Sequence, residues 1–125
     1  MLLNVLVVCA CACVGALMRW GFQAWLNPGG LLPWGTLAVN LIGGYLIGLA
    51  IAGFAALPDI DPAWRLMVIT GFLGTLTTFS SFSAEVVGML IGGRPGLALA
   101  TAALHLAGSL GLTWLGWRTV QHFLH

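Results

Sequence analysis

Seven hydroxyl side chains and two glycines lie close together between residues 70 and 85, in the segment TGFLGTLTTFSSFSAE. Gly71 and Gly74 weaken a helix, and Ser and Thr side chains can satisfy the backbone groups that a break releases. A break near Thr78 would expose carbonyl oxygens between Gly74 and Thr77, which suit a hard cation such as sodium. The residues leave an alternative equally open, an unbroken helix whose hydroxyls bond to carbonyls one turn earlier.

Two aromatic rings follow the expected break. Phe79 and Phe82 are three residues apart, so they share one face of a helix. Core packing is the ordinary role of such a pair. The edge of a phenyl ring carries partial positive charge, however, so ring edges along a pathway favour a small anion without trapping it at a full charge.

A polar stripe follows in the last apolar segment of the chain. Thr101, His105, Ser109 and Thr113 recur every four residues, which puts them on one helix face. Donors along one face can replace the hydration shell of an anion step by step. Hydrogen bonds that hold neighbouring helices together are the alternative.

Arg19 and Glu85 are the remaining ionisable residues near or within membrane depth, where a charge is costly unless it faces water or a partner. Arg19 either snorkels to the interface or lines the mouth of a pathway, where it raises the local concentration of anions. Glu85 has no paired carboxylate, and His105 is far in the sequence from His122 and His125. No enzyme active site is therefore predicted.

The composition indicates what must position these residues. Only 6% of the 125 residues are charged, 60% are hydrophobic, and the mean hydropathy is +1.04. A soluble domain carries about a quarter charged residues, so a soluble enzyme, a nucleic-acid binder and a disordered chain are excluded. Four segments can cross the roughly 30 Å of hydrocarbon in a bilayer. We therefore expect an all-α integral membrane protein with one transmembrane domain over residues 1–125, and spans at about 2–26, 34–57, 64–92 and 95–122.

The charges do not favour one orientation in the membrane. With four spans both chain ends lie on one side; Arg65 and Arg118 are nearest that side, and Arg19 and Arg94 are nearest the other. Lys and Arg in short loops set how a chain inserts. Two arginines on each side give no bias, which favours dual topology, in which oppositely inserted copies pair as an antiparallel homodimer. Alternatively, lipid or partner subunits carry the bias.

Small residues in the second span indicate close helix packing. Asn40, Gly44, Gly48 and Ala52 recur every four residues. Such a face lets another backbone approach closely. The pattern does not say which helix does so.

Three motifs carry a family likeness: GALMR at 15–19, WGTLAVNLIG at 34–43 and GFLGTLTTFSSFS at 71–83. They resemble the Fluc fluoride channels of bacteria, also called CrcB proteins, and the likeness covers all four spans. The resemblance implies an antiparallel, dual-topology homodimer in the bacterial plasma (inner) membrane. It also implies two fluoride pores, passive export of fluoride, and a sodium ion at the dimer centre.

The resemblance assigns pathway roles to individual residues. Phe79 and Phe82 would contact fluoride, and Asn40 would donate to the ion and position a phenylalanine. Ser109 and Thr113 would belong to a fourth-span polar track. Family members often have a tyrosine in that span, whereas the only tyrosine here is Tyr45. Two residues therefore occupy track positions that relatives fill otherwise, namely Thr101 and His105.

The same resemblance assigns the cation site and the vestibule. The carbonyls of Gly74 and Thr77 would bind sodium, and Arg19 would be the vestibule arginine.

Two other functions share this architecture. A proton-coupled multidrug exporter can have four spans and dual topology, but we would expect it to carry a carboxylate near its first span, where this chain has none. Glu85 is the sole candidate. A non-conducting membrane assembly subunit is the other possibility.

Overall fold

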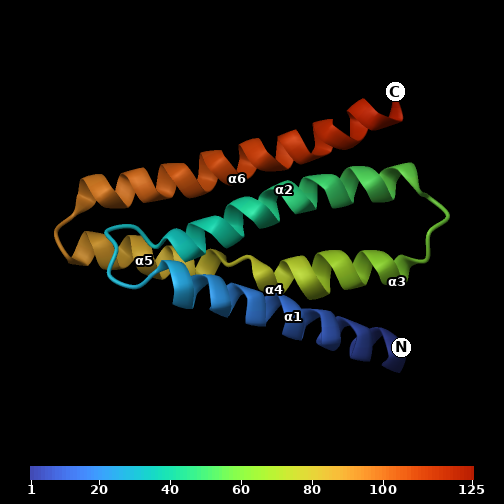
Figure 1. The fold of residues 1–125 in the computed structure, drawn as a ribbon, viewed down its shortest axis with the longest axis horizontal. Coiled ribbons are helices and arrows are strands. Elements are labelled where there is room, and N and C mark those ends of the chain that lie inside the picture. The colour runs from blue at the N-terminus through green and yellow to red at the C-terminus, as the bar shows by residue number, and fades with distance from the viewer.

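The computed structural model describes all 125 residues, and the chain is helical apart from its turns (Figure 1). Four stretches are long and apolar enough to cross a membrane. They are α1 (Leu2–Leu26), α2 (Trp34–Ala56), the interrupted stretch Pro62–Ile91, and α6 (Pro95–Leu124). The predicted all-α, multi-pass membrane architecture is confirmed.

The third span is interrupted. It consists of α3 (Pro62–Arg65), the π-helical segment η1 (Leu66–Leu73), α4 (Gly74–Leu76) and α5 (Phe79–Ile91). Between α4 and α5 the backbone is extended, with ψ 158° at Thr77 and φ −153° at Thr78. The predicted break is confirmed, and the alternative of an unbroken helix is wrong.

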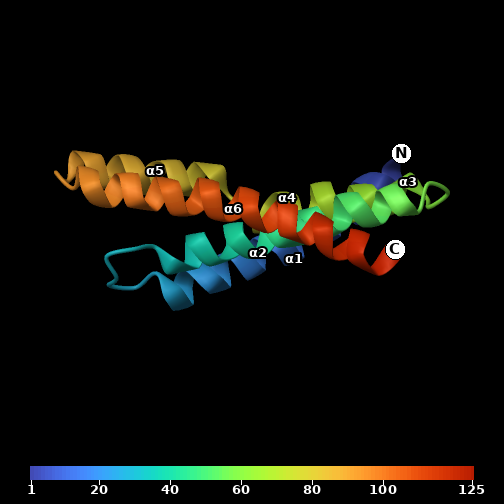
Figure 2. The same ribbon diagram turned by 90° about the horizontal axis from the view of Figure 1, so that it is seen from above.

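The break lets the two halves of the third span pack against different neighbours. The first half, η1 and α4, contacts α1, whereas α5 contacts α6. Figure 2 shows α5 running beside α6 and away from α1 and α2. A straight helix could not pack in this way against both α1 and α6.

The span ends differ slightly from those predicted. The third span begins at Pro62 instead of residue 64, because Asp61 caps it: Ala63 N donates to Asp61 Oδ1 at 2.8 Å. Proline is favoured at the first position of a helix, where its missing N–H costs nothing. That span and α2 each end one residue earlier than predicted, and α6 continues two residues further.

The small-residue face of α2 packs within the chain, against α6. Gly44 and Gly48 are buried. A Cβ at Gly44 would lie 2.9 Å from the carbonyl oxygen of Ser109, and one at Gly48 would overlap the carbonyl of Thr113. The pattern therefore marks an intramolecular helix pair.

Both chain ends lie at one end of the bundle with the α2–α3 loop, and the other two loops lie at the opposite end (Figures 1 and 2). The buried core is small and includes Val39 and Leu76. Large apolar side chains such as Trp20, Leu99 and Leu110 are exposed on the outside. Such a surface suits lipid or another membrane-embedded protein.

Candidate ion pathway

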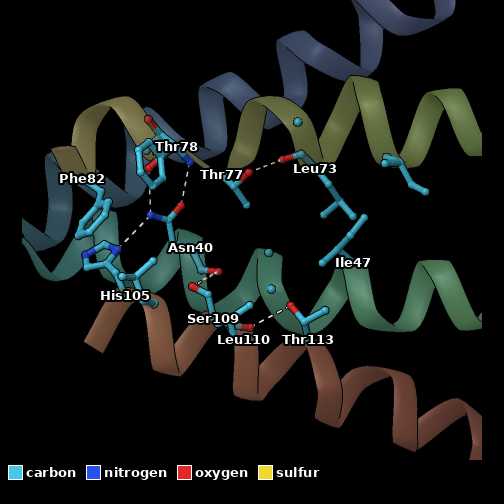
Figure 3. A pocket seen from close by; sticks show the side chains of 16 residues that line it. Asn40, Ile47, Leu73, Thr77, Thr78, Phe82, His105, Ser109, Leu110 and Thr113 are labelled. Atoms are coloured by element: carbon cyan, nitrogen blue, oxygen red, sulfur yellow. Dashed lines mark hydrogen bonds between the residues drawn. The ribbon is translucent and has the colours of Figure 1, made fainter. Parts of the chain in front are cut away.

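A single asparagine on α2 holds the break in the third span. The N–H of Thr78 donates to Asn40 Oδ1 at 2.8 Å, and Asn40 Nδ2 donates to the Thr78 carbonyl at 3.0 Å (Figure 3). We term these two bonds the Asn40 clamp. In a continuous helix both main-chain groups would bond one turn away. The clamp satisfies them instead, as backbone at membrane depth requires.

At the break, the carbonyl oxygens of Gly74 and Thr77 are among those that lose their helical donors. The N–H that would reach the Gly74 carbonyl is that of Thr78, which the clamp holds. The N–H that would reach the Thr77 carbonyl is that of Ser81, which donates to Thr78 Oγ1 at 3.1 Å. Arg19 Nη1 lies 3.5 Å from the Thr77 oxygen. Arg19 therefore reaches the break in the third span.

The hydroxyls of the third span have two uses. Thr75 and Thr77 donate to carbonyls one turn earlier, those of Gly71 at 2.8 Å and Leu73 at 2.9 Å. This is the bonding that the unbroken-helix alternative assumed, and it occurs before the break. Thr78 instead caps the start of α5, which a threonine at that position does well.

Phe79 and Phe82 differ sharply in exposure. Phe79 is 71% exposed, and Phe82 is 7% exposed. Their centroids are 5.4 Å apart with an interplanar angle of 72°, an edge-to-face pair. Phe82 also stacks on His105, with centroids 4.4 Å apart. Phe82 is thus fixed within the chain, whereas most of the Phe79 ring is free.

Three of the four residues in the α6 stripe lie together, and one does not. Thr113 Oγ1 donates to the Ser109 carbonyl at 2.9 Å, and Ser109 Oγ lies 3.5 Å from the Asn40 carbonyl. His105 Nδ1 lies 3.1 Å from Asn40 Nδ2. Thr101 is buried elsewhere, and its hydroxyl faces the sulfur of Met89 at 3.4 Å.

One open groove of about 490 Å³ connects these side chains (Figure 3). Eight of the ten predicted site residues line it, and Arg19 and Thr101 do not. The eight are Asn40, Gly74, Thr77, Phe79, Phe82, His105, Ser109 and Thr113. Apolar side chains such as Ile47 and Leu73 complete the lining. The groove therefore combines hydroxyls, ring edges and freed backbone oxygens at membrane depth.

A second polar cluster was not predicted from the sequence. The fully buried hydroxyl of Thr36 donates a hydrogen bond to Glu85 Oε1 at 2.5 Å. The same hydroxyl accepts hydrogen bonds from Gln23 Nε2 at 3.2 Å and from Asn27 Nδ2 at 3.4 Å. Glu85 Oε2 has no protein partner. Thr36 precedes Asn40 by one turn, a spacing that could have indicated a shared polar face.

No group of three or more His, Cys, Asp or Glu side chains converges anywhere in the chain. The groups that line the groove are backbone atoms, hydroxyls, an amide and aromatic rings. Such groups bind and release ions without covalent chemistry.

Comparison with known proteins agrees with this reading. A family model described as CrcB-like protein, Camphor Resistance (CrcB), matches residues 6–117. The chain is 73% identical over 124 residues to the fluoride-specific ion channel FluC of Paracidovorax citrulli (strain AAC00-1), covering 99% of this chain and 98% of that one. It is 69% identical over 121 residues to the FluC of Variovorax paradoxus (strain S110), covering 97% of each chain.

The likeness extends to relatives of lower identity. Identity is 54% over 119 residues to the FluC of Chromohalobacter salexigens, covering 93% of this chain and 89% of that one. These relatives are named as ion channels and not as enzymes, in agreement with the prediction of no enzyme. Because the matches span nearly all of the chain, this protein belongs to the CrcB family, the family of relatives named fluoride-specific ion channels.

Proposed function

We propose that this chain forms a fluoride-selective channel that exports fluoride from the cytoplasm by passive electrodiffusion. The observation that carries the proposal is the groove beside the broken third span, where ring edges, hydroxyls and main-chain groups meet. Unwound backbone at membrane depth is tolerated only where protein buries it or water reaches it. A groove of this kind therefore calls for an aqueous path and a second protein surface.

We infer that a second copy of the chain supplies that surface, in the opposite orientation. The exposed ring of Phe79 and the exposed Gly74 lie in the middle of a span, where a partner can cover them. The even division of arginines between the two ends permits both orientations. An antiparallel homodimer has one groove from each copy, so we propose two pores.

The anion path runs along one face of the groove. Edges of Phe79 and Phe82 offer partial positive charge. The hydroxyl of Ser109 is only loosely held, since 3.5 Å to the Asn40 carbonyl is at the long limit of a hydrogen bond. It can turn toward an anion, with Thr113 one turn further. Fluoride is small and a strong acceptor, so close, numerous donors replace its hydration better than that of chloride. The Arg19 charge near the break raises the local anion concentration.

The freed carbonyls of the break fit a sodium ion. The donor set is neutral oxygen at the end of a half-helix, which is how unwound membrane helices coordinate sodium. The residues that would hold it are Gly74 and Thr77, whose oxygens have lost their helical N–H donors. When bound at the centre of the dimer, sodium would supply a fixed positive charge that ties the two copies together.

The test is fluoride efflux from liposomes that hold the purified protein, monitored with a fluoride electrode. We place this chain in the bacterial inner membrane, where such a path would let fluoride leave the cytoplasm down its electrochemical gradient. We expect fast, electrogenic fluoride efflux, no comparable chloride efflux, and no need for a proton gradient. Flux that stops when the proton gradient is dissipated would favour an exporter. Liposomes that stay silent would favour an assembly subunit.

A further inference from the structure

His105 is the buried polar residue of the groove whose role the proposed pathway leaves open. Its side chain is 3% exposed, on α6, and faces α2 and α5. Nδ1 lies 3.1 Å from Asn40 Nδ2, and the ring stacks on Phe82 at 26°. The other nitrogen, Nε2, is buried without a protein partner.

The bonds around Asn40 determine which ring nitrogen of His105 carries hydrogen. The oxygen of the Asn40 amide is identified by the Thr78 N–H that it accepts, and the nitrogen by the Thr78 carbonyl to which it donates. An amide nitrogen has two hydrogens. One points to the Thr78 carbonyl, so the other points to His105 Nδ1. That nitrogen must accept, which leaves the ring hydrogen on Nε2.

The two hydrogens of the Asn40 amide also limit what else this side chain can bind. While these three bonds hold, both hydrogens of its amide are in use and none is left for an ion. The direct contact of the Asn40 amide with fluoride, which the family resemblance implies, would require one bond to open. Asn40 acts in this geometry by holding the extended backbone at Thr78.

We propose that His105 is a positioning residue whose Nδ1 accepts the second amide hydrogen of Asn40, fixes the amide in the orientation of the clamp, and supports the Phe82 ring. It thereby couples α6 to the break in the third span through one side chain. The effect on flux rests on the proposed function, whereas the bonding pattern does not. The chemistry required at position 105 is a hydrogen-bond acceptor near Cγ, with a flat group against Phe82.

Three substitutions separate these requirements. His105→Asn keeps an acceptor near the place of Nδ1, His105→Gln carries its amide one bond further out, and His105→Phe keeps the ring without either nitrogen. We expect efflux within about threefold of wild type for His105→Asn, and about tenfold or more below it for the other two, because an amide hydrogen is then left without an acceptor. His122→Asn, at an exposed site on the same helix, is the matched control and should conduct normally.

The pattern of rates decides the proposal. Normal efflux in His105→Phe would overturn it, and so would a loss in His105→Asn as large as in His105→Phe. All variants are first compared with wild type by size-exclusion chromatography and thermal melting, and only those that elute like wild type enter the comparison.

Nitrogen-15 NMR of histidine-labelled protein gives a test that needs no flux. The background is His122→Gln with His125→Gln, which leaves His105 as the only histidine. We expect a bare Nδ1 and a protonated Nε2. Hydrogen on Nδ1 would overturn the proposal even if every flux result agreed. If instead the wild-type protein failed to conduct fluoride while NMR gave the expected pattern, the proposed function would fail and the positioning role would stand.

Discussion

Replacing Asn40 with Asp tests the Asn40 clamp without changing the size of the side chain. In Asn40→Asp the oxygen that accepts from the Thr78 N–H is kept. The group that donates to the Thr78 carbonyl at 3.0 Å and to His105 Nδ1 at 3.1 Å becomes an oxygen. The contact with the Thr78 carbonyl therefore becomes a contact between two acceptors, whereas the His105 ring can move its hydrogen to Nδ1 and donate to the new carboxylate.

The expected loss follows from the contact with the Thr78 carbonyl. A hydrogen bond contributes about 1 kcal/mol net, and a buried polar group left without its partner costs about 1–3 kcal/mol. Losing the Thr78 contact therefore gives a penalty of about 1–3 kcal/mol for the broken conformation of the third span. Since about 1.4 kcal/mol corresponds to a factor of ten in a population, we expect fluoride efflux to fall about tenfold or more.

The assay is initial fluoride efflux from liposomes at equal protein density, with dimer content measured by size-exclusion chromatography. Tyr45→Phe is the matched control. Tyr45 also joins α2 to α6, through a 3.2 Å bond from its hydroxyl to Thr119 Oγ1, and lies outside the groove. A single bond of this kind in a membrane protein contributes about 0.6 kcal/mol, so we expect little change in flux. Efflux from Asn40→Asp within threefold of wild type, with the protein folded, would refute the clamp.

Four further outcomes are expected. Phe82→Ile removes the ring edge and the stacking on His105, and should lower efflux by about tenfold or more while the protein still elutes as wild type; an unchanged rate would remove Phe82 from the pathway. Thr101→Val should leave efflux within about twofold of wild type, because the Thr101 hydroxyl faces Met89 and not the groove. The substitution should lower the free energy of unfolding by about 1 kcal/mol or less. A large loss of flux would instead place Thr101 on the ion pathway. Gly48→Leu should destabilise the protein by about 1–3 kcal/mol, because a Cβ there would overlap a carbonyl of α6; an unchanged melting temperature would contradict the observed packing. Replacing sodium with N-methylglucamine should lower the melting temperature, since a ligand that binds only the folded protein stabilises it, and an identical melting curve would argue against the proposed sodium site.

The sequence was sufficient to predict the membrane architecture, because hydrocarbon imposes strong rules on composition. With only 6% charged residues, the chain has too few polar groups to cover a soluble fold. A backbone in lipid must also satisfy its own hydrogen bonds. Span length then follows from bilayer thickness, and Pro and Gly mark the turns. The predicted ends differ by one or two residues where a cap such as Asp61 determines the start.

Most of the predicted groove residues carried a local signal in the sequence, whereas the pathway role of Asn40 came from the family resemblance. Hydroxyls beside glycines in residues 70–85 indicated a break, and the four-residue spacing in α6 indicated one face. The spacing could not separate Thr101 from the rest of that face. Whether a polar side chain faces the groove or Met89 depends on how α6 crosses its neighbours, and periodicity does not report this.

The identity of the bonding partners came only from the tertiary structure. Asn40 and Thr78 are 38 residues apart, and Asn40 and His105 are 65 apart. No local pattern encodes which amide meets which carbonyl, because such pairs depend on the relative rotation and height of packed helices. The sequence alone left a broken and an unbroken third helix equally open. The structure decides for the break, since an amide on α2 satisfies the two main-chain groups of Thr78 that an unbroken helix would have satisfied itself.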